Sequence, residues 1–165
     1  MRRRLLLAAA SALSLSAILV PAMPAFADEA ANIAVVDAYL AAWNAHDIAA
    51  AASHFADSVV YYDSSVGTPV EGKEAATTGV VASFINAVPD LEWTMRGDPV
   101  ASGDKVAFEW EFSGTNTGAW GDGTAASGKA FSFTGASVFE LKDGAIVRQS
   151  DYYDALGFFK QLGWI

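Results

Sequence analysis

The sequence predicts an α+β domain in which three helices of the N-terminal half pack on a strongly curved antiparallel sheet. Two observations predict this class. Up to about residue 88, apolar residues recur at spacings of three and four, as on the buried face of a helix. Beyond residue 90 they alternate with polar residues, as in strands with one buried face. The expected order is helix, helix, strand, helix, four strands and a short helix, arranged as a cone with one open end.

The N-terminal half contains the three longer predicted helices and one strand. The first helix is expected over residues 29–44, where one apolar face is formed by Val35, Val36, Tyr39, Leu40 and Trp43. Asp47 follows a turn and should cap a short helix over residues 48–55. The β-branched and aromatic residues of 58–63 predict a strand. Another helix is expected over residues 73–87. It should end there because the proline at position 89 prevents its continuation.

The C-terminal half should supply four strands and the last helix. The inward-facing residues of the first two strands are predicted to be Leu91, Trp93, Met95, Val106, Phe108, Trp110 and Phe112. A glycine-rich loop over residues 115–128 precedes a strand with inward-facing Phe131, Phe133, Phe139 and Leu141. Asp143-Gly144 is typical of a hairpin turn. The last strand, residues 146–153, leads to Asp154, which should cap the terminal helix.

Residues 1–27 have the features of a signal peptide. Three arginines, Arg2 to Arg4, precede an apolar stretch, and Ala25-Phe26-Ala27 fits the small-x-small rule for cleavage. A membrane anchor is the alternative, but serines dilute the apolar stretch and two prolines follow it. We therefore expect export, to the periplasm or the medium, of a single domain formed by residues 28–165. The sequence has no cysteine, so this domain depends on its core and not on disulfides.

The charge of the expected mature chain limits its partners. Without the three leader arginines, seven Lys and Arg face 19 Asp and Glu, a formal net charge of −12. Such a surface repels phosphate backbones and anionic lipids, which argues against nucleic-acid binding and against membrane binding after cleavage. The abundant apolar and aromatic residues, 53% and 12% of the chain, are enough for a packed core and an apolar cavity.

Two sets of motifs resemble a known group of proteins. The phrase Tyr39-x-Ala-Ala-x-Asn-Ala-x-Asp47, followed by Phe-Ala-Asp and a strand ending in Asp63, resembles the opening of ketosteroid isomerase. Later motifs resemble the SnoaL-like polyketide cyclases: Gly114-Thr-Asn-Thr-Gly, Ser127-Gly-Lys, Asp143-Gly, Tyr153-Asp and Gln161-Leu-Gly. Both belong to the nuclear transport factor 2-like superfamily, whose fold is the cone predicted above. Together the motifs cover nearly all of residues 28–165.

The resemblance suggests the first candidate catalytic residues. Asp63 falls where the isomerase has its general base, and Tyr39 where it has an oxyanion-binding phenol. Asp63 lies on the same face of the strand as Val59 and Tyr61, which suggests that it faces an apolar cavity. Burial in such a cavity would raise the pKa of Asp63 toward neutrality, as a general base requires. The alternative is an Asp that caps the turn at Ser64-Ser65 in water. For Tyr39 the alternative is an ordinary core residue.

Other candidates come from strand parity and from the same resemblance. By the isomerase pattern Asp151 and Tyr153 face inward, which makes Asp151 a second candidate acid or base. Ser137 lies near the position of a protonated Asp in the isomerase and is expected to donate a weak hydrogen bond to the ligand; the alternative is a small core residue bonded to its own strand. Asn116 stands where many SnoaL-like sequences have His, and it could orient a carbonyl or simply shape its loop. The remaining predicted substrate-binding residues are Trp43, Tyr61 and Trp110.

These features predict an exported, cofactor-independent enzyme that transfers a proton next to a carbonyl, as an isomerase or a cyclase. Its partner would be a small, apolar, carbonyl-containing molecule. The alternative is a non-catalytic domain that binds a hydrophobic ligand or another protein. We expect no metal, because His46 and His54 have no metal-binding spacing and cysteine is absent, and no glycine-rich phosphate loop follows a strand.

A homodimer is expected through the outer face of the sheet. The outward positions have a small-residue character that suits contact between sheets: Thr94, Ala107, Ser132, Thr134, Ala136 and Val138. The resemblance implies the same pairing. Three glutamates of that face, Glu109, Glu111 and Glu140, would oppose it if they met across a two-fold axis.

Overall fold

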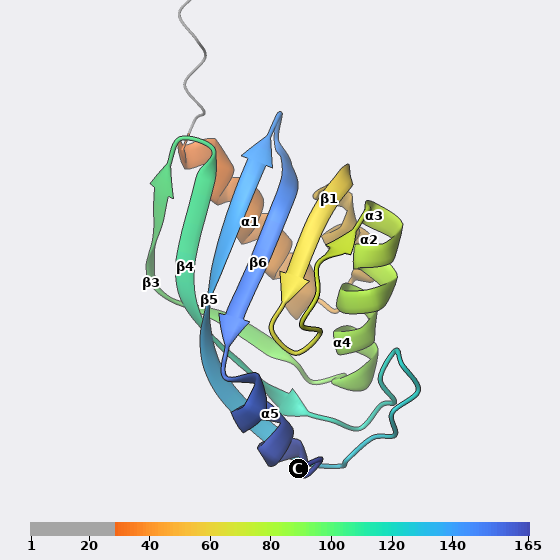
Figure 1. Ribbon diagram of the computed structural model, residues 1–165. Helices are drawn as coiled ribbons and strands as arrows, with labels where there is room; N and C mark the ends of the chain where they lie inside the picture. The colour runs from red at the N-terminus through yellow and green to blue at the C-terminus, as the bar shows by residue number, and fades with distance from the viewer. Residues whose placement is uncertain (1–28) are drawn as a thin grey trace, which may run out of the picture.

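The computed structural model describes residues 29–165, which form one six-stranded, curved sheet with helices packed against it (Figure 1). The strand order is β2-β1-β6-β5-β4-β3. The strands are β1 (Phe55–Asp63), β2 (Val70–Glu71), β3 (Glu92–Ser102), β4 (Lys105–Thr115), β5 (Ala130–Lys142) and β6 (Ala145–Tyr153). The helices are α1 (Glu29–Asn44), α2 (Ile48–Ser53), α3 (Lys73–Ala76), the π-helical turn η1 (Thr77–Val81), α4 (Ala82–Ala87) and α5 (Ala155–Leu162). The leader predicted over residues 1–27 lies outside the described residues.

The layers confirm the predicted α+β cone. In Figure 1, α1 crosses behind the sheet, the α3–α4 segment stands beside β1, and α5 lies at the lower end with the loop between β4 and β5. The side chains predicted to face inward from β4 and β5 are buried or half-buried and pack on the helices. Stacked rings join neighbouring strands, as in the pair Phe108–Phe139, whose centroids are 5.7 Å apart. No helix within residues 29–165 is long and apolar enough to cross a membrane.

The first strand is longer than the sequence predicts. The short helix ends at Ser53 and not at residue 55, and Phe55 opens β1 in register with Ile146 of β6. Pairing with a distant strand therefore overrides the local helical pattern. Asp47 caps α2 as predicted, since its side chain accepts a hydrogen bond from the Ala50 N–H at 2.9 Å. The two-residue strand β2, which pairs with β1, is too short to show a period in the sequence.

The sheet is antiparallel except at one pair. β1 runs parallel to β6, and their register places Asp63 directly beside Asp151. The sequence does not reveal this pairing, because four of the six strands and the α3–α4 segment come between the two strands in the chain. Both strands end at the same end of the sheet (Figure 1). Each carries a carboxylate there, Asp63 on β1 and Asp151 on β6.

The predicted helix over residues 73–87 contains a π-helical turn. Its first four residues are α-helical, the turn Thr77–Val81 comes next, and α4 ends at Ala87. The Thr77 and Thr78 hydroxyls donate to the carbonyls four residues earlier, at 2.7 and 2.9 Å, which favours distortion of the backbone ladder. A π-turn shifts the register of the helical residues after it, and here it precedes Phe84, which faces the interior.

Candidate active site

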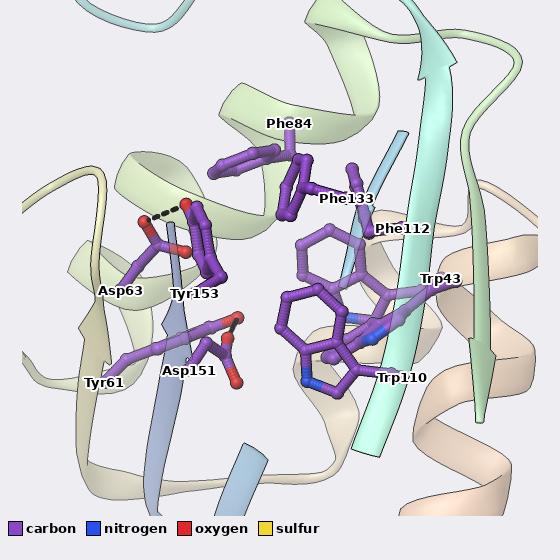
Figure 2. A pocket seen from close by; sticks show the side chains of 10 residues that line it. Trp43, Tyr61, Asp63, Phe84, Trp110, Phe112, Phe133, Asp151 and Tyr153 are labelled. Carbon is purple, nitrogen blue, oxygen red and sulfur yellow. Dashed lines mark hydrogen bonds between the residues drawn. The ribbon is translucent and has the colours of Figure 1, made fainter. Parts of the chain in front are cut away.

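A cavity lies between the inner face of the sheet and helices α1 and α4 (Figure 2). Aromatic rings form most of its wall, and two carboxylates stand on one side of it. The lining residues are Trp43, Tyr61, Asp63, Phe84, Trp93, Trp110, Phe112, Phe133, Asp151 and Tyr153. The cavity is narrow. Its volume of about 20 Å³ gives room for one or two water molecules.

Asp63 and Asp151 are brought together by the parallel pairing of β1 with β6. They are register partners at the ends of these strands, and only 4% of each residue is exposed. Neighbouring strands lie about 4.8 Å apart, so the two side chains are adjacent. Among the residues lining the cavity there is no Lys, Arg or His to balance their charge.

Asp151 is surrounded by hydrogen-bond donors. The Ser137 hydroxyl donates to its Oδ1 at 2.5 Å, and the Tyr61 hydroxyl donates to its Oδ2 at 2.7 Å. The Gln149 amide adds contacts to Oδ1 and Oδ2 at 3.2 and 3.0 Å. These groups fix the orientation of the carboxyl and favour its ionised form.

The direction of these hydrogen bonds is set by the donors behind them. The Trp110 Nε1–H, which can only donate, reaches the Ser137 Oγ at 2.8 Å, so the serine hydrogen points to Asp151. In the same way the Gln149 amide donates to the Tyr61 oxygen at 2.8 Å, and the tyrosine hydrogen is directed at the carboxyl. Ser137 thus positions Asp151 from behind and does not line the cavity.

Asp63 both lines the cavity and caps the turn after β1, so the two roles considered for it coexist. Its Oδ1 accepts from the Ser65 N–H at 2.8 Å, the Ser65 hydroxyl at 2.6 Å and the Tyr153 hydroxyl at 2.8 Å. Within residues 29–165 no hydrogen bond reaches Oδ2. Figure 2 shows the bond to Tyr153 and the carboxyl facing the cavity.

Burial shifts the proton affinity of both carboxyls upward. Desolvation, followed by the charge of Asp63, raises the pKa of Asp151 from 3.8 to about 7. Desolvation also raises the pKa of Asp63, against the opposing effect of its donors Ser65 and Tyr153. The charge of Asp63 thus disfavours ionisation of Asp151, and Asp151 retains its proton toward neutral pH.

Comparison with known proteins supports the predicted family. A family model described as SnoaL-like polyketide cyclase matches residues 33–162. The chain belongs to this SnoaL-like family. No curated protein sequence matches it at a significant level.

Solved structures show the same fold for this SnoaL-like chain. TsrD from Streptomyces laurentii is similar at 28% identity and a TM-score of 0.70, over 84% of this chain and 98% of that one. AclR from Streptomyces galilaeus is 22% identical at a TM-score of 0.68, over 84% of each chain. A ketosteroid isomerase-like protein from Catenulispora acidiphila is 24% identical at 0.65, over 78% of this chain and 92% of that one.

Besides Ser137, two predicted site residues of the SnoaL-like domain lie away from the cavity. Tyr39 is fully buried among core rings, and its hydroxyl is close to Trp43, Tyr61 and Gln149 without a hydrogen bond of ordinary geometry. Burial raises the pKa of this phenol far above its ordinary value. It therefore lies behind Tyr61, which lines the cavity together with Tyr153.

Asn116, the second of these residues, shapes its loop, which is one of the two roles considered for it. Its fully buried amide donates to the carbonyls of Ala87 and Gly118, at 3.0 and 2.8 Å, and accepts from the Ser127 N–H at 2.7 Å. These bonds fasten the β4–β5 loop to the end of α4.

The structure also adds residues that the sequence reasoning missed. Gln149 is fully buried beside Asp151. The sequence could have indicated it, because Gln149 lies on the same face of the last strand as Asp151 and Tyr153. Trp93 is predicted on the inner face but not in the site, whose wall it forms in part. Phe84 also lines the cavity, and the signal for it is its spacing of four residues from the buried Val80 and Val88.

A second cavity of about 370 Å³ adjoins the first and shares Phe84 with it. It is lined by Ser65, Val66, Gly79, Ser83, Phe84, Trp120, Asp122, Phe158, Phe159 and Trp164. Phe84 makes edge contacts with Trp120 on this side and Phe112 on the inner side, at centroid distances of 5.2 and 5.8 Å. The ring thus stands between a roomy outer cavity and the narrow inner one.

The described part of the chain offers no cluster of three or more His, Cys, Asp or Glu that could hold a metal ion. The site does offer a pair of carboxyls with raised pKa values, directed hydrogen bonds and an apolar wall. Such an arrangement can take up and return a proton near neutral pH.

Proposed function

We propose that this SnoaL-like protein is an enzyme that moves a proton next to a carbonyl group, as in an isomerisation or a ring closure. The observation that carries the proposal is the pair of adjacent, buried carboxyls in an aromatic cavity. At neutral pH the pair would hold about one proton, so one member can act as base while the other holds an acid proton.

The hydrogen bonds suggest a role for each carboxyl. Asp63 has one oxygen, Oδ2, that no described donor occupies, and this oxygen would remove the proton from the carbon next to the carbonyl. Asp151, with a pKa of about 7, would hold the proton that is returned to the enolate at another carbon. Tyr61, Ser137 and Gln149 would keep Asp151 in place by their directed hydrogen bonds. The proposed step needs no cofactor.

The walls of the cavity indicate the substrate class. Rings of Trp, Phe and Tyr favour a flat, apolar molecule, and the carboxyls leave little tolerance for an anionic group near them. A ligand larger than two waters requires the inner cavity to widen, and Phe84 is the side chain placed to move. The outer cavity would hold the rest of a polycyclic substrate. Export by the predicted leader would place this activity outside the cytoplasm.

The test uses a small ring ketone, β,γ-cyclohexenone, whose conversion to the conjugated isomer requires removal and return of one proton. Turnover is followed by ultraviolet absorbance, and proton exchange by NMR in D₂O. Replacing either carboxyl, by Asp63→Asn or Asp151→Asn, should lower the rate by roughly 10²–10⁴-fold. Asp57→Asn, at an exposed carboxylate of the same strand, is the control. Equal rates in all four proteins would refute the proposal.

A second candidate is non-catalytic binding of a small organic cation. Aromatic rings around two carboxylates, with no basic residue in the lining, are suited to a methylated ammonium group. The related protein from Catenulispora acidiphila was solved in complex with trimethylamine. Calorimetry with choline and with its neutral isostere, in which carbon replaces nitrogen, separates the two candidates. Tight binding of choline alone, together with no proton exchange in any ketone, would favour the second.

A further inference from the structure

Two tryptophans that line the inner cavity have buried indole N–H groups without an acceptor. Trp43 and Trp93 both line the cavity, and only 2% and 3% of these residues are exposed. Across residues 29–165, no side chain or carbonyl accepts a hydrogen bond from either Nε1. Burying an unpaired donor costs stability, and folded proteins pair the great majority of such groups.

A third indole of the same cavity provides the contrast. The Trp110 Nε1–H donates to the Ser137 hydroxyl at 2.8 Å, and this bond belongs to the chain that positions Asp151. Of the three tryptophans in the wall, Trp110 is therefore bonded within the protein, whereas Trp93 and Trp43 are not. The Tyr39 hydroxyl lies near Trp43, but the two make no hydrogen bond of ordinary geometry.

The two free indoles are held in a fixed relation to each other. Their rings meet edge to face, with centroids 5.2 Å apart. Asn44, the residue after Trp43, binds the backbone of Trp93 at both groups: its Nδ2 donates to the Trp93 carbonyl at 2.9 Å, and its Oδ1 accepts from the Trp93 N–H at 2.7 Å. This amide clamp ties the end of α1 to β3 and preorganises both side chains.

We propose that the indole N–H groups of Trp43 and Trp93 form a donor pair that binds a carbonyl oxygen of the ligand. The inference rests on the proposed function and names the oxygen-binding part of the same site. In Figure 2 the two carboxyls occupy one side of the cavity and Trp43 the other, so a ketone can span them. Its oxygen would face the indoles while its neighbouring carbon faces Asp63.

The chemistry of indole defines the ligand further. An indole N–H donates and never accepts, so the pair suits a carbonyl and, still better, the enolate oxygen that forms when the proton leaves. The same groups offer no hydrogen-bond acceptor to an ammonium ion. Tyr39, the phenol first expected to bind this oxygen, lies behind this wall in the core.

The test compares two molecules of the same shape in the ¹H–¹⁵N spectrum of the five indoles of the full-length wild-type protein. Cyclohexanone carries a carbonyl oxygen, and methylenecyclohexane carries a CH₂ group in its place. We expect cyclohexanone alone to move the Trp43 and Trp93 N–H signals downfield, while the signal of Trp110 stays close to its free position. Signals are assigned from through-space contacts, so no core variant is required.

Affinity gives a second readout. Trp43→Phe and Trp93→Phe should each weaken cyclohexanone binding roughly tenfold and leave binding of the hydrocarbon almost unchanged. Equal indole shifts with both molecules, or no binding of the ketone up to its solubility, would overturn the proposal. The outcome is independent of turnover: ketone-specific shifts in a protein whose Asp63→Asn variant keeps full proton exchange would refute the proposed function and leave the donor pair standing.

Discussion

Asp63 and Asp151 are equally buried but differ in their hydrogen bonds. Asp151 receives donors on both oxygens, whereas Asp63 receives them on Oδ1 only. The difference gives each carboxyl a distinct proposed role: Oδ2 of Asp63 is open to accept a proton, and the donors around Asp151 fix the orientation of the carboxyl that holds the acid proton. It also explains why Ser137, Tyr61 and Gln149 matter although they carry no charge.

The raised pKa of Asp151 predicts an unusual dependence of stability on pH. The folded protein keeps a proton on this carboxyl up to about pH 7, whereas the unfolded chain releases it near 3.8. Between these values a rise in pH therefore lowers the free energy of unfolding, by up to about 1.4 kcal/mol per pH unit for one proton. Urea denaturation between pH 4 and 8 should show this loss, with a shallower slope in Asp151→Asn. An unchanged slope would show that Asp151 ionises as it does in water.

Ser137→Ala should raise the pKa of the carboxyl pair. It removes a donor to ionised Asp151 and leaves the Trp110 N–H without an acceptor. We expect the pH profile of activity to move upward and stability to fall by about 1–3 kcal/mol. Ser132→Ala is the control, since that hydroxyl lies on the outer face of the same strand and donates to Glu111. Identical pH profiles for both variants would contradict the positioning role.

At the scale of elements, the sequence predicts the features that local patterns encode. Alternation in β4 and β5 places Trp110 and Ser137 on the inner face, whereas for β6 only the resemblance to the isomerase places Asp151 there, because both parities of that strand carry polar residues. It does not predict that β1 lies parallel to β6, because that contact depends on the packing of everything between them. The adjacency of the two carboxyls is a product of this pairing, so it emerges only from the structure.

The α3–α4 segment shows a second limit of the sequence. A helix over residues 73–87 is predicted and is present, but periodicity does not reveal the π-turn at Thr77–Val81 within it. The buried face is still readable from the sequence, because Val80, Phe84 and Val88 recur every four residues and all three are buried. The spacing does not show that Phe84 reaches the cavity. Trp43, in the regular helix α1, is found from the sequence because the pitch there is unbroken.

A single glycine of β5 leaves space for the cavity wall. An added Cβ at Gly135 would collide with the ring of Trp110 and approach the Tyr152 carbonyl to 2.7 Å. Gly135→Ala should therefore displace Trp110, weaken ketone binding and cost about 1–3 kcal/mol. Gly79→Ala is the matched control, because its added Cβ meets nothing within 4 Å and helical alanine is favoured over glycine. Thermal unfolding should separate the two, and equal stability would contradict the packing described.

At the scale of the whole molecule, the outer sheet face remains the expected dimer interface. Two of the three glutamates that would oppose pairing have basic partners within the chain: Arg96 lies 3.9 Å from Glu111, and Lys105 lies 3.1 Å from Glu140. Exposed apolar side chains, Val138 and Tyr152, lie on the same face. The local charge is thus milder than the acidic composition suggests.

We predict a homodimer through this face that becomes tighter as salt screens the net charge. Sedimentation at micromolar protein and several salt concentrations measures it. Val138→Glu, near the middle of the face, should shift the protein to monomer, whereas Val100→Glu, at the far end of β3, should not. Monomer under all conditions in the wild-type protein would rule the interface out.

The most direct test of the central claim is a ¹³C titration of the Asp63 and Asp151 carboxyls by NMR. If the two buried carboxyls share a proton, their signals should change together, with one apparent pKa near 7. Asp151→Asn should remove that step and leave Asp63, whose pKa is raised by burial, as the single titrating carboxyl of the cavity. Two independent titrations, both near the ordinary value of 3.8, would contradict the account, since neither carboxyl could then hold an acid proton at neutral pH.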